Sequence, residues 1–450
     1  RLSQLAARLA STMRCSCSLL LLLGSALRAS SFSVPCHAAA SGRPAAATSR
    51  GTVSLADVGA ASTAFYTDEV RKESYPSMAD VLDAKVADPD LRRLMLTLFG
   101  AFATVSAALR AELVVKAEEQ KSVFGDVQLG VDVLADQLLW DVCRSEPLIK
   151  TGSSEEAPDV REMHAGGRFC LCWDPLDGSA IVDNNWAVGT IIGVWPAATG
   201  VIGATGRDQV ASMVANYGPR TTAFATLDDG VYEFTLGVGG ADGWLCSRER
   251  VRISPQSRIF SPANLRTARH ELPGYGELID YWLDQRYTLR FCGGLVPDIC
   301  QQFSKGQGVL TNPPGGDTAP AKLRLAFECA PFSLLVEAAG GKSSDAVTGG
   351  SVLDVPIEGI DQRTSIAIGS ADEVDRFNAL VLPSVRAGPI PYMDGQPTTH
   401  GLNAGKAPAP RPPQDGRRSP IFLAEPSGTE NGKAPPASQQ RGGWGDQNVY

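Results

Sequence analysis

The chain has 450 residues, 43% of them hydrophobic and 20% charged, which is the usage of an ordinary globular protein. Its formal net charge is -8 and its pI is near 5.2. This acidity argues against nucleic acid or an anionic membrane surface as a partner. The length suits one two-lobed unit with tails.

Residues 1–50 have the composition of a leader. Because residue 1 is Arg, we take this leader from Met13. The apolar run from Cys17 to Leu27 is too short to span a bilayer and is typical of a signal peptide. The stretch from Ser31 to Arg50 is rich in Ala, Ser and Arg and lacks acidic residues, as transit peptides do. The alternative is a plain secretory signal.

Helix and strand patterns alternate through the first half of the chain. Apolar residues at helical spacing predict a helix over Pro89–Leu113, and a second over Gly125–Cys143. Apolar runs predict strands at Phe169–Trp173, Val188–Trp195, Thr221–Leu227 and Val231–Leu236, with Asp228-Asp229-Gly230 as a hairpin turn between the last two.

After Ser254 the pattern becomes that of an α/β lobe. The predicted elements are a strand near Thr288–Cys292, a helix near Val296–Lys305, a helix from Ala321 to Gly340-Gly341, a strand at Ser365–Ile368 and a helix at Ala371–Leu382. Residues 385–450 are rich in Pro, Gly, Ser and Gln, and we expect a disordered tail there.

The most informative segment runs from Phe169 to Ala180. An apolar strand ends in Asp174 and Asp177, Pro175 stiffens the link, and Gly178 allows a sharp turn. Backbone N–H groups in such a turn can hold an anion, and two carboxylates beside an anion require divalent cations between them. Asp-Pro and Asp-Gly also occur in ordinary turns. The whole unit favours a metal-dependent phosphate site.

This segment, with Val188–Pro196, Asp208-Gln209-Val210 and Tyr217-Gly218-Pro219-Arg220-Thr221, resembles the sugar bisphosphatases of the inositol phosphatase superfamily, and within them the sedoheptulose-1,7-bisphosphatase branch. The resemblance covers residues 79–382. It implies an α/β fold, a five-layered α-β-α-β-α sandwich with an N-terminal lobe over 55–253 and a C-terminal α/β lobe over 254–384. It also implies hydrolysis of the 1-phosphate of sedoheptulose-1,7-bisphosphate, a Calvin-cycle reaction.

The site residues follow from the same resemblance, motif by motif. The implied catalytic residues are Asp126, Asp132 and Glu156. The implied metal set is Glu155, Asp174, Leu176, Asp177 and Glu328. The implied phosphate and sugar ligands are Gly178, Ser179, Ala180, Asn264, Tyr217, Arg290 and Lys322. All-oxygen ligation indicates Mg²⁺, with Mn²⁺ as an alternative.

The implied mechanism is attack by an activated water. Metal ions bridge the 1-phosphate, Asp132 and Glu156 orient and deprotonate the water, and metal stabilises the leaving alkoxide. Three departures from the family pattern predict altered substrate affinity: Ala180 replaces a serine, Phe291 a tyrosine, and Val127 an acidic residue.

Two other functions remain open. One is fructose-1,6-bisphosphatase, with the same chemistry on a shorter sugar; Gly193-Val194-Trp195-Pro196 and Thr311-Asn312 count against it, because fructose enzymes usually carry a substrate-contacting tyrosine near the latter pair. The other is a catalytically dead sugar-phosphate-binding relative, against which the retained acids argue.

The resemblance also sets the expected cellular context. For a carbon-fixation enzyme, a signal peptide followed by a transit peptide predicts a complex plastid as the destination. In the relatives an arginine matching Arg290 reaches into a neighbouring subunit, so we expect a dimer or tetramer, with no membrane contact in the mature form. The segment Val114–Phe124 lacks the cysteines of the thioredoxin-regulated plastid enzymes. We therefore expect activity that is nearly independent of reductant.

Overall fold

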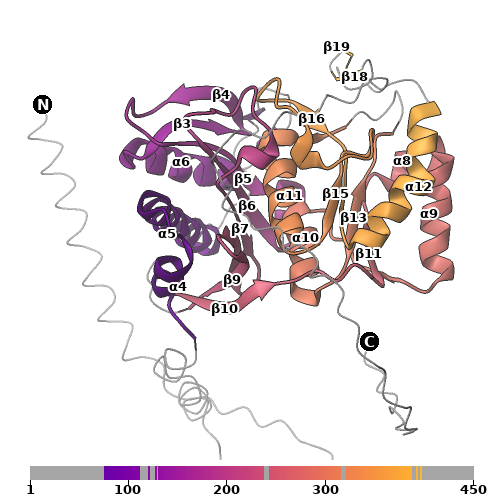
Figure 1. Cartoon of the computed structure of the whole chain (residues 1–450), viewed down its shortest axis with the longest axis horizontal. Helices are drawn as coiled ribbons and strands as arrows, with labels where there is room; N and C mark the ends of the chain where they lie inside the picture. Colours follow the sequence, from indigo (N-terminus) through magenta and orange to yellow (C-terminus); the bar gives the residue numbers. More distant parts are fainter. Residues whose placement is uncertain are drawn as a thin grey trace, which may run out of the picture. The chain divides into compact units, whose positions relative to one another are not determined.

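Two β-sheets and three layers of helices make up the part of the chain that the structure describes (Figure 1). The computed structural model describes residues 75–111, 120–121, 127–128, 130–237, 243–315, 321–387, 392–393 and 396–397. The predicted leader and most of the predicted tail lie outside these residues.

The larger sheet has eight strands in the order β10-β9-β8-β7-β6-β5-β3-β4. Its strands are β3 Ile149–Ser154, β4 Ala157–Glu162, β5 Phe169–Asp177, β6 Val188–Pro196, β7 Ala211–Tyr217, β8 Thr221–Leu227, β9 Gly230–Leu236 and β10 Trp244–Val251. Neighbours are antiparallel except for β3 and β5, which run parallel. The parallel pair places the ends of β3 and β5 side by side.

The smaller sheet has five strands in the order β12-β11-β13-β17-β15. Its strands are β12 Thr288–Leu289, β11 Ile259–Pro262, β13 Val309–Asn312, β17 Ile366–Gly369 and β15 Lys342–Ser344. Short antiparallel pairs lie outside the sheets: β1 Gln120–Lys121 with β2 Val127–Gln128, β14 Leu323–Arg324 with β16 Arg363–Thr364, and β18 Tyr392–Met393 with β19 Gln396–Pro397.

Helices cover both sheets and fill the space between them. The outer layer on the larger sheet contains α4 Met78–Lys85, α5 Pro89–Ala111 and α6 Gly130–Ser145. The middle layer contains α10 Leu295–Lys305 and α11 Ala330–Ala338, and α11 contacts strands of both sheets. The outer layer on the smaller sheet contains α8 Leu265–Glu271, α9 Pro273–Asp284 and α12 Ala371–Ala387. The predicted α-β-α-β-α order is confirmed.

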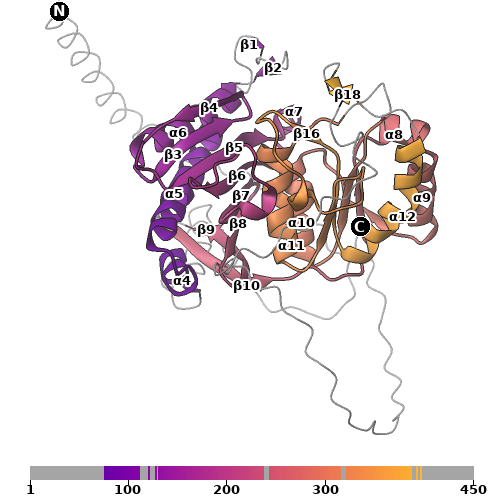
Figure 2. The ribbon, with the colours of Figure 1, turned by 45° about the horizontal axis from the view of Figure 1, so that its top comes forward.

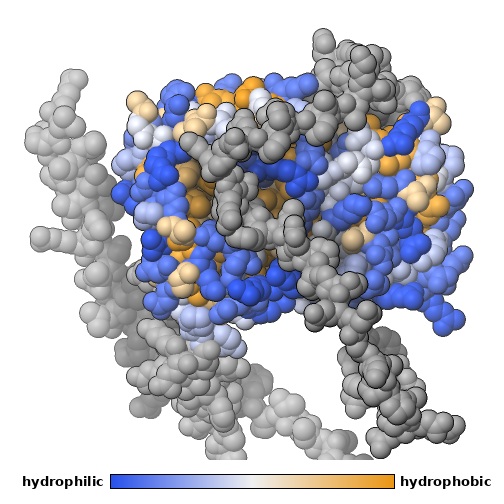
Figure 3. Space-filling model, viewed as in Figure 1, coloured by the Kyte–Doolittle hydropathy of each residue, from blue (hydrophilic) through white to orange (hydrophobic). Residues whose placement is uncertain are grey.

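Each layer of helices buries its own apolar core. Helix α5 places Leu91, Leu94, Leu98 and Phe102 in the core beneath the larger sheet, at the spacing the sequence predicts. Among the described helices, α5 alone is long and apolar enough to cross a bilayer, and half of that apolar window is buried inside the protein. On the face seen in Figure 3, the parts not covered by grey atoms are mainly hydrophilic.

Several predicted boundaries were wrong. The second helix starts at Gly130, not Gly125, because Val127–Gln128 pairs as strand β2. The helix predicted from Ala321 is β14 followed by a π-helix, η4 Leu325–Cys329, and then α11. Strand β5 runs on to Asp177, and α12 runs on to Ala387. The strand predicted over Thr288–Cys292 is only β12, Thr288–Leu289.

Candidate active site

Strand β5 carries the two aspartates of the signature at its irregular end. It is buried on both faces from Phe169 to Leu176, so it lies in the middle of the protein. The register with β6 shifts between Asp174 and Asp177. Within that shift the N–H of Leu176 donates to Oδ1 of Asp174 at 3.0 Å. The end of β5 therefore departs from the regular hydrogen-bond ladder with β6.

Three carboxylates from distant parts of the sequence meet here. One oxygen each of Asp174, Asp177 and Glu328 lies within 4.8 Å of the other two. Glu328 belongs to the π-helix η4, which packs against β5 and β6. Its Oε2 accepts the N–H of Arg324 at 2.5 Å. Only 4% of Asp174 and 5% of Glu328 is exposed. We call these three residues the acid cluster.

The acid cluster cannot be fully ionised without a cation. Burial raises the pKa of Asp174 well above its usual range, and the charges of Glu155, Asp177 and Glu328 raise it further. Burial, then the charge of Glu155, raises the pKa of Glu328. Burial raises the pKa of Asp177 to about 7, although two backbone N–H groups oppose the shift. Clustered, buried carboxylate oxygens are the donor set that Mg²⁺ or Mn²⁺ takes. The residues therefore fit a divalent metal.

The first turn of helix α10 donates hydrogen bonds to the side chain of Asp177. The N–H groups of Leu295 and Val296 donate to its two carboxylate oxygens at 3.0 and 2.6 Å. This contact needs a close approach between α10 and β6, which glycine allows. Gly189 pairs with Asp177 across the strands, and a Cβ at Gly189 would lie 2.3 Å both from Cγ1 of Val296 and from the carbonyl oxygen of Ala215 on β7. No local sequence pattern predicts this arrangement.

The predicted glutamate pair lies in the turn between β3 and β4. Arg324 forms an ion pair with Glu155, Nη1 to Oε1 at 3.2 Å, while its backbone N–H holds Glu328. Arg324 is therefore a site residue that the sequence analysis missed. It lies between Lys322 and Glu328, both of which the family resemblance implies as site residues, so the signal was present.

The phosphate turn predicted at residues 178–180 follows the acid cluster. Gly178 has φ +95°, a conformation that glycine adopts readily, and it precedes the short helix α7, Ser179–Val182. Ser179 is partly exposed and Ala180 is exposed. Their role as phosphate ligands stays a prediction.

Three further predicted site residues belong to the first half of the chain. Asp132 is buried on the first turn of α6, which packs on β3 and β5. Asp126 lies outside the described residues. Tyr217 is buried, its hydroxyl lies 2.9 Å from that of Thr190, and Thr190 donates to the Pro175 carbonyl at 2.7 Å. Tyr217 thus supports the signature loop, and its contact with substrate stays a prediction.

Three predicted substrate ligands belong to the second half of the chain. Asn264 precedes α8 with φ +52°, and its Nδ2 donates to the Pro313 carbonyl at 2.9 Å. Arg290 is exposed just after β12, and Lys322 is exposed just before β14. None of these contacts joins them to the acid cluster, so their roles stay predictions.

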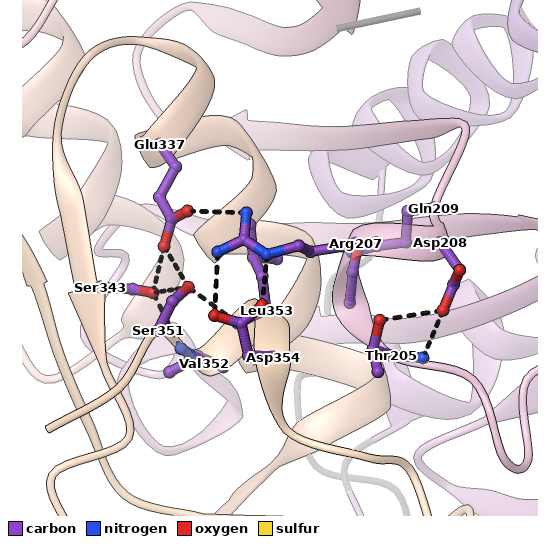
Figure 4. Close-up of polar contacts among 11 residues, drawn as sticks. Thr205, Arg207, Asp208, Gln209, Glu337, Ser343, Ser351, Val352, Leu353 and Asp354 are labelled. Atoms are coloured by element: carbon purple, nitrogen blue, oxygen red, sulfur yellow. Dashed lines mark hydrogen bonds and ion pairs between the residues drawn. The ribbon is translucent and has the colours of Figure 1, made fainter. Parts of the chain in front are cut away.

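A polar network anchors the helix that follows Glu328 (Figure 4). Arg207 forms ion pairs with Asp354 and with Glu337 near the end of α11. At the start of α11, Nε2 of Gln209 donates to the Ala330 carbonyl at 3.1 Å. The segment after β6 therefore holds both ends of α11, which continues the π-helix carrying Glu328.

Comparison with known proteins identifies the family. A sequence model of the fructose-1-6-bisphosphatase N-terminal domain matches residues 78–244, and a model of its C-terminal domain matches residues 253–382. The chain belongs to the fructose-1,6-bisphosphatase family. This bisphosphatase is therefore a phosphoric monoester hydrolase of a metal-dependent family, with the family's α/β sandwich fold.

Individual relatives of this bisphosphatase include both sugar specificities. The chloroplastic sedoheptulose-1,7-bisphosphatase of Spinacia oleracea is 41% identical over 320 residues, which cover 70% of this chain and 80% of the relative. A class 1 fructose-1,6-bisphosphatase of Geotalea uraniireducens is 36% identical, over 58% of this chain and 82% of the relative. A crystal structure from Toxoplasma gondii, assigned as a sedoheptulose-1,7 bisphosphatase, has a TM-score of 0.63 and 41% identity, covering 69% of this chain and 99% of that one.

Proposed function

We propose that this bisphosphatase hydrolyses the 1-phosphate of sedoheptulose-1,7-bisphosphate in the presence of Mg²⁺. The observation that carries the proposal is the acid cluster at the end of β5, directly before the Gly178 turn. The higher identity to the sedoheptulose enzyme than to the fructose enzyme supports the seven-carbon sugar. The Thr311-Asn312 pair supports it too, because fructose enzymes usually carry a substrate-contacting tyrosine there. The Thr311 hydroxyl is buried and lies 3.1 Å from the hydroxyl of Tyr275.

Separate groups of residues would bind the metal, activate the water and hold the phosphate. The cations would be held by four carboxylates, those of Glu155, Asp174, Asp177 and Glu328. The backbone carbonyl of Leu176 would be a further ligand. Bound Mg²⁺ supplies Lewis-acid stabilisation of the phosphate and of the leaving alkoxide. Asp132 and Glu156 would orient a water and take its proton, and the backbone N–H groups of the Gly178 turn would hold the phosphate oxygens.

The test is a comparison of kcat/KM for two substrates under the same conditions. Purified protein with Mg²⁺ would release phosphate from sedoheptulose-1,7-bisphosphate at least about tenfold more efficiently than from fructose-1,6-bisphosphate, a difference of about 1.4 kcal/mol in transition-state binding. A higher value for the fructose substrate would favour the second family activity. No release from either sugar would support the catalytically dead relative.

We also propose that the enzyme is located in a plastid and that it forms oligomers. The leader composition and the chloroplastic relative support the plastid location. Leu289 and Phe291, which flank Arg290, are about half exposed and support a protein contact there. A fluorescent reporter fused to residues 13–50 should reach a plastid, and its secretion would oppose the proposal. Light scattering of the purified enzyme should give a dimer or tetramer, and a monomer would oppose it.

A further inference from the structure

One carboxylate outside the predicted site receives side-chain hydrogen bonds from two neighbouring strands. Oδ1 of Asp136, on helix α6, accepts the Ser154 hydroxyl at 2.5 Å and the Trp173 indole N–H at 3.0 Å. Its Oδ2 accepts the Trp140 indole N–H at 3.0 Å. Ser154 and Trp173 are paired in the parallel register of β3 and β5, so a single oxygen joins the two strands.

Each of these strand donors directly precedes a carboxylate of the site. Ser154 comes before Glu155, and Trp173 comes before Asp174. Neighbouring side chains on a strand point to opposite faces of the sheet. Trp173 therefore faces α6, while Asp174 faces the side on which η4 carries Glu328. Fixing Trp173 from one side fixes where Asp174 emerges on the other, and fixing Ser154 fixes the start of the turn that carries Glu155.

One further hydrogen bond and one helical spacing extend this control to the rest of the site. The N–H of Glu156 donates to the Ser154 hydroxyl at 3.3 Å, so the turn with both glutamates is joined to Asp136 through one side chain. Asp136 also lies four residues after Asp132, on the same face of α6. Figures 1 and 2 show α6 beside β3 and β5. A shift of α6 would move Asp132 and the strand ends relative to each other.

We propose that Asp136 is a positioning residue for the metal site: it sets the relative placement of Glu155 and Asp174, and couples both to the helix that carries Asp132. Partners of this kind, which hold ligands without touching the metal, typically alter metal affinity or activity by about 10- to 100-fold when they are removed. The inference rests on the proposed function, because it assumes that these acids bind a divalent cation.

The experiment compares two variants with a matched control. Asp136→Asn removes the charge and one acceptor. Ser154→Ala removes the hydrogen bond that joins Asp136 to β3, together with the one that the Glu156 N–H donates to the same hydroxyl. Trp140→Phe is the control, because it removes the donor to the other oxygen and leaves both strand contacts in place. The readouts are Mn²⁺ binding measured from the free-ion EPR signal, the kcat and KM for the sugar bisphosphate, and the unfolding temperature.

We expect both Asp136→Asn and Ser154→Ala to bind Mn²⁺ about tenfold more weakly and to lose about tenfold in kcat, with KM changed less than about twofold. Trp140→Phe should unfold at a lower temperature yet bind Mn²⁺ within about twofold of wild type. If Asp136→Asn does not fold, Ser154→Ala alone decides.

Folded variants that bind Mn²⁺ as the wild type does would overturn the inference. An equal loss of Mn²⁺ affinity in Trp140→Phe would overturn it as well, because Asp136 would then act only through packing of the core. The failure of the proposed function is distinguishable from both results: wild type would then show no metal-dependent phosphate release in the first place.

Discussion

The raised pKa of Asp177 makes the metal-free protein less stable as the pH rises. Its carboxyl has a pKa of about 7 in the folded protein, against about 3.9 in an unfolded chain. Between these values the folded state binds a proton that the unfolded state has released. The free energy of unfolding therefore falls as the pH increases through this window. Asp174 and Glu328, whose pKa values are also raised, act in the same direction.

The size of the effect follows from the shift. About three pKa units at about 1.4 kcal/mol each give about 4 kcal/mol for Asp177 alone. Because Asp177 is partly exposed, solvent screening reduces this to about 2–4 kcal/mol. A divalent cation binds the ionised form, so Mg²⁺ should remove most of the loss.

Urea unfolding from about pH 5 to about pH 8, once with EDTA and once with excess Mg²⁺, measures this directly. The wild type in EDTA should lose stability across the range, and Asp177→Asn should show a shallower loss because it cannot ionise. A metal-free wild type as stable at the upper pH as at the lower would mean that these carboxyls bind their protons no more tightly in the folded state than in the unfolded state. An unchanged slope in Asp177→Asn would refute the assignment to this residue.

Three further predictions concern the base residues, the glycine beneath α10 and the response to reductant. Asp132→Asn and Glu156→Gln should abolish phosphate release while circular dichroism shows an intact fold; near-wild-type turnover with Mg²⁺ would contradict the base assignment. Gly189→Ala should cost about 1–3 kcal/mol in urea unfolding and weaken Mn²⁺ binding, because the new Cβ would clash with the Ala215 carbonyl of β7 and with Val296 of α10; unchanged binding would mean that the clash is relieved without moving α10. Oxidised enzyme treated with reduced thioredoxin should keep its activity, and a several-fold gain would reveal a regulatory disulfide.

The cysteines bear on the last of these outcomes. All seven cysteines of the described residues are free thiols, and six of them are buried. Burial raises the pKa of Cys143 to about 12, which leaves that thiol unreactive at neutral pH. Cys292 is partly exposed, and burial raises its pKa to about 11. These thiols have the character of core residues.

Local sequence patterns predict those helices and strands whose own residues strongly favour the helix or strand. The apolar run of β5 and the helical spacing in α5 are strong enough to identify both, and the motif around Asp174 marked the site. Strand β3 was missed because its sequence, Ile149–Ser154, is largely polar or small. It becomes a strand through its pairing with β5. The sequence predicts an α-helix across the π-helix η4, because the residues of η4 are almost all apolar.

Contacts between distant segments could not be predicted from local patterns. The hydrogen bonds from the start of α10 to Asp177 join residues 118 and 119 positions apart. The link from Asp136 to Trp173 spans 37 positions and depends on the parallel pairing of β3 with β5. The family resemblance supplied the acids themselves, whereas the groups that hold them in place appear only in the folded protein.

We infer that the acid cluster makes this chain a metal-dependent sugar bisphosphatase. The decisive measurement is phosphate release from sedoheptulose-1,7-bisphosphate by wild type and by Asp174→Asn, each across a Mg²⁺ titration. We predict release by wild type that rises with Mg²⁺ and stops with EDTA, and a loss of at least about a hundredfold in the variant at any Mg²⁺ concentration. Release by wild type that persists in EDTA, or a variant as active as wild type, would contradict the claim.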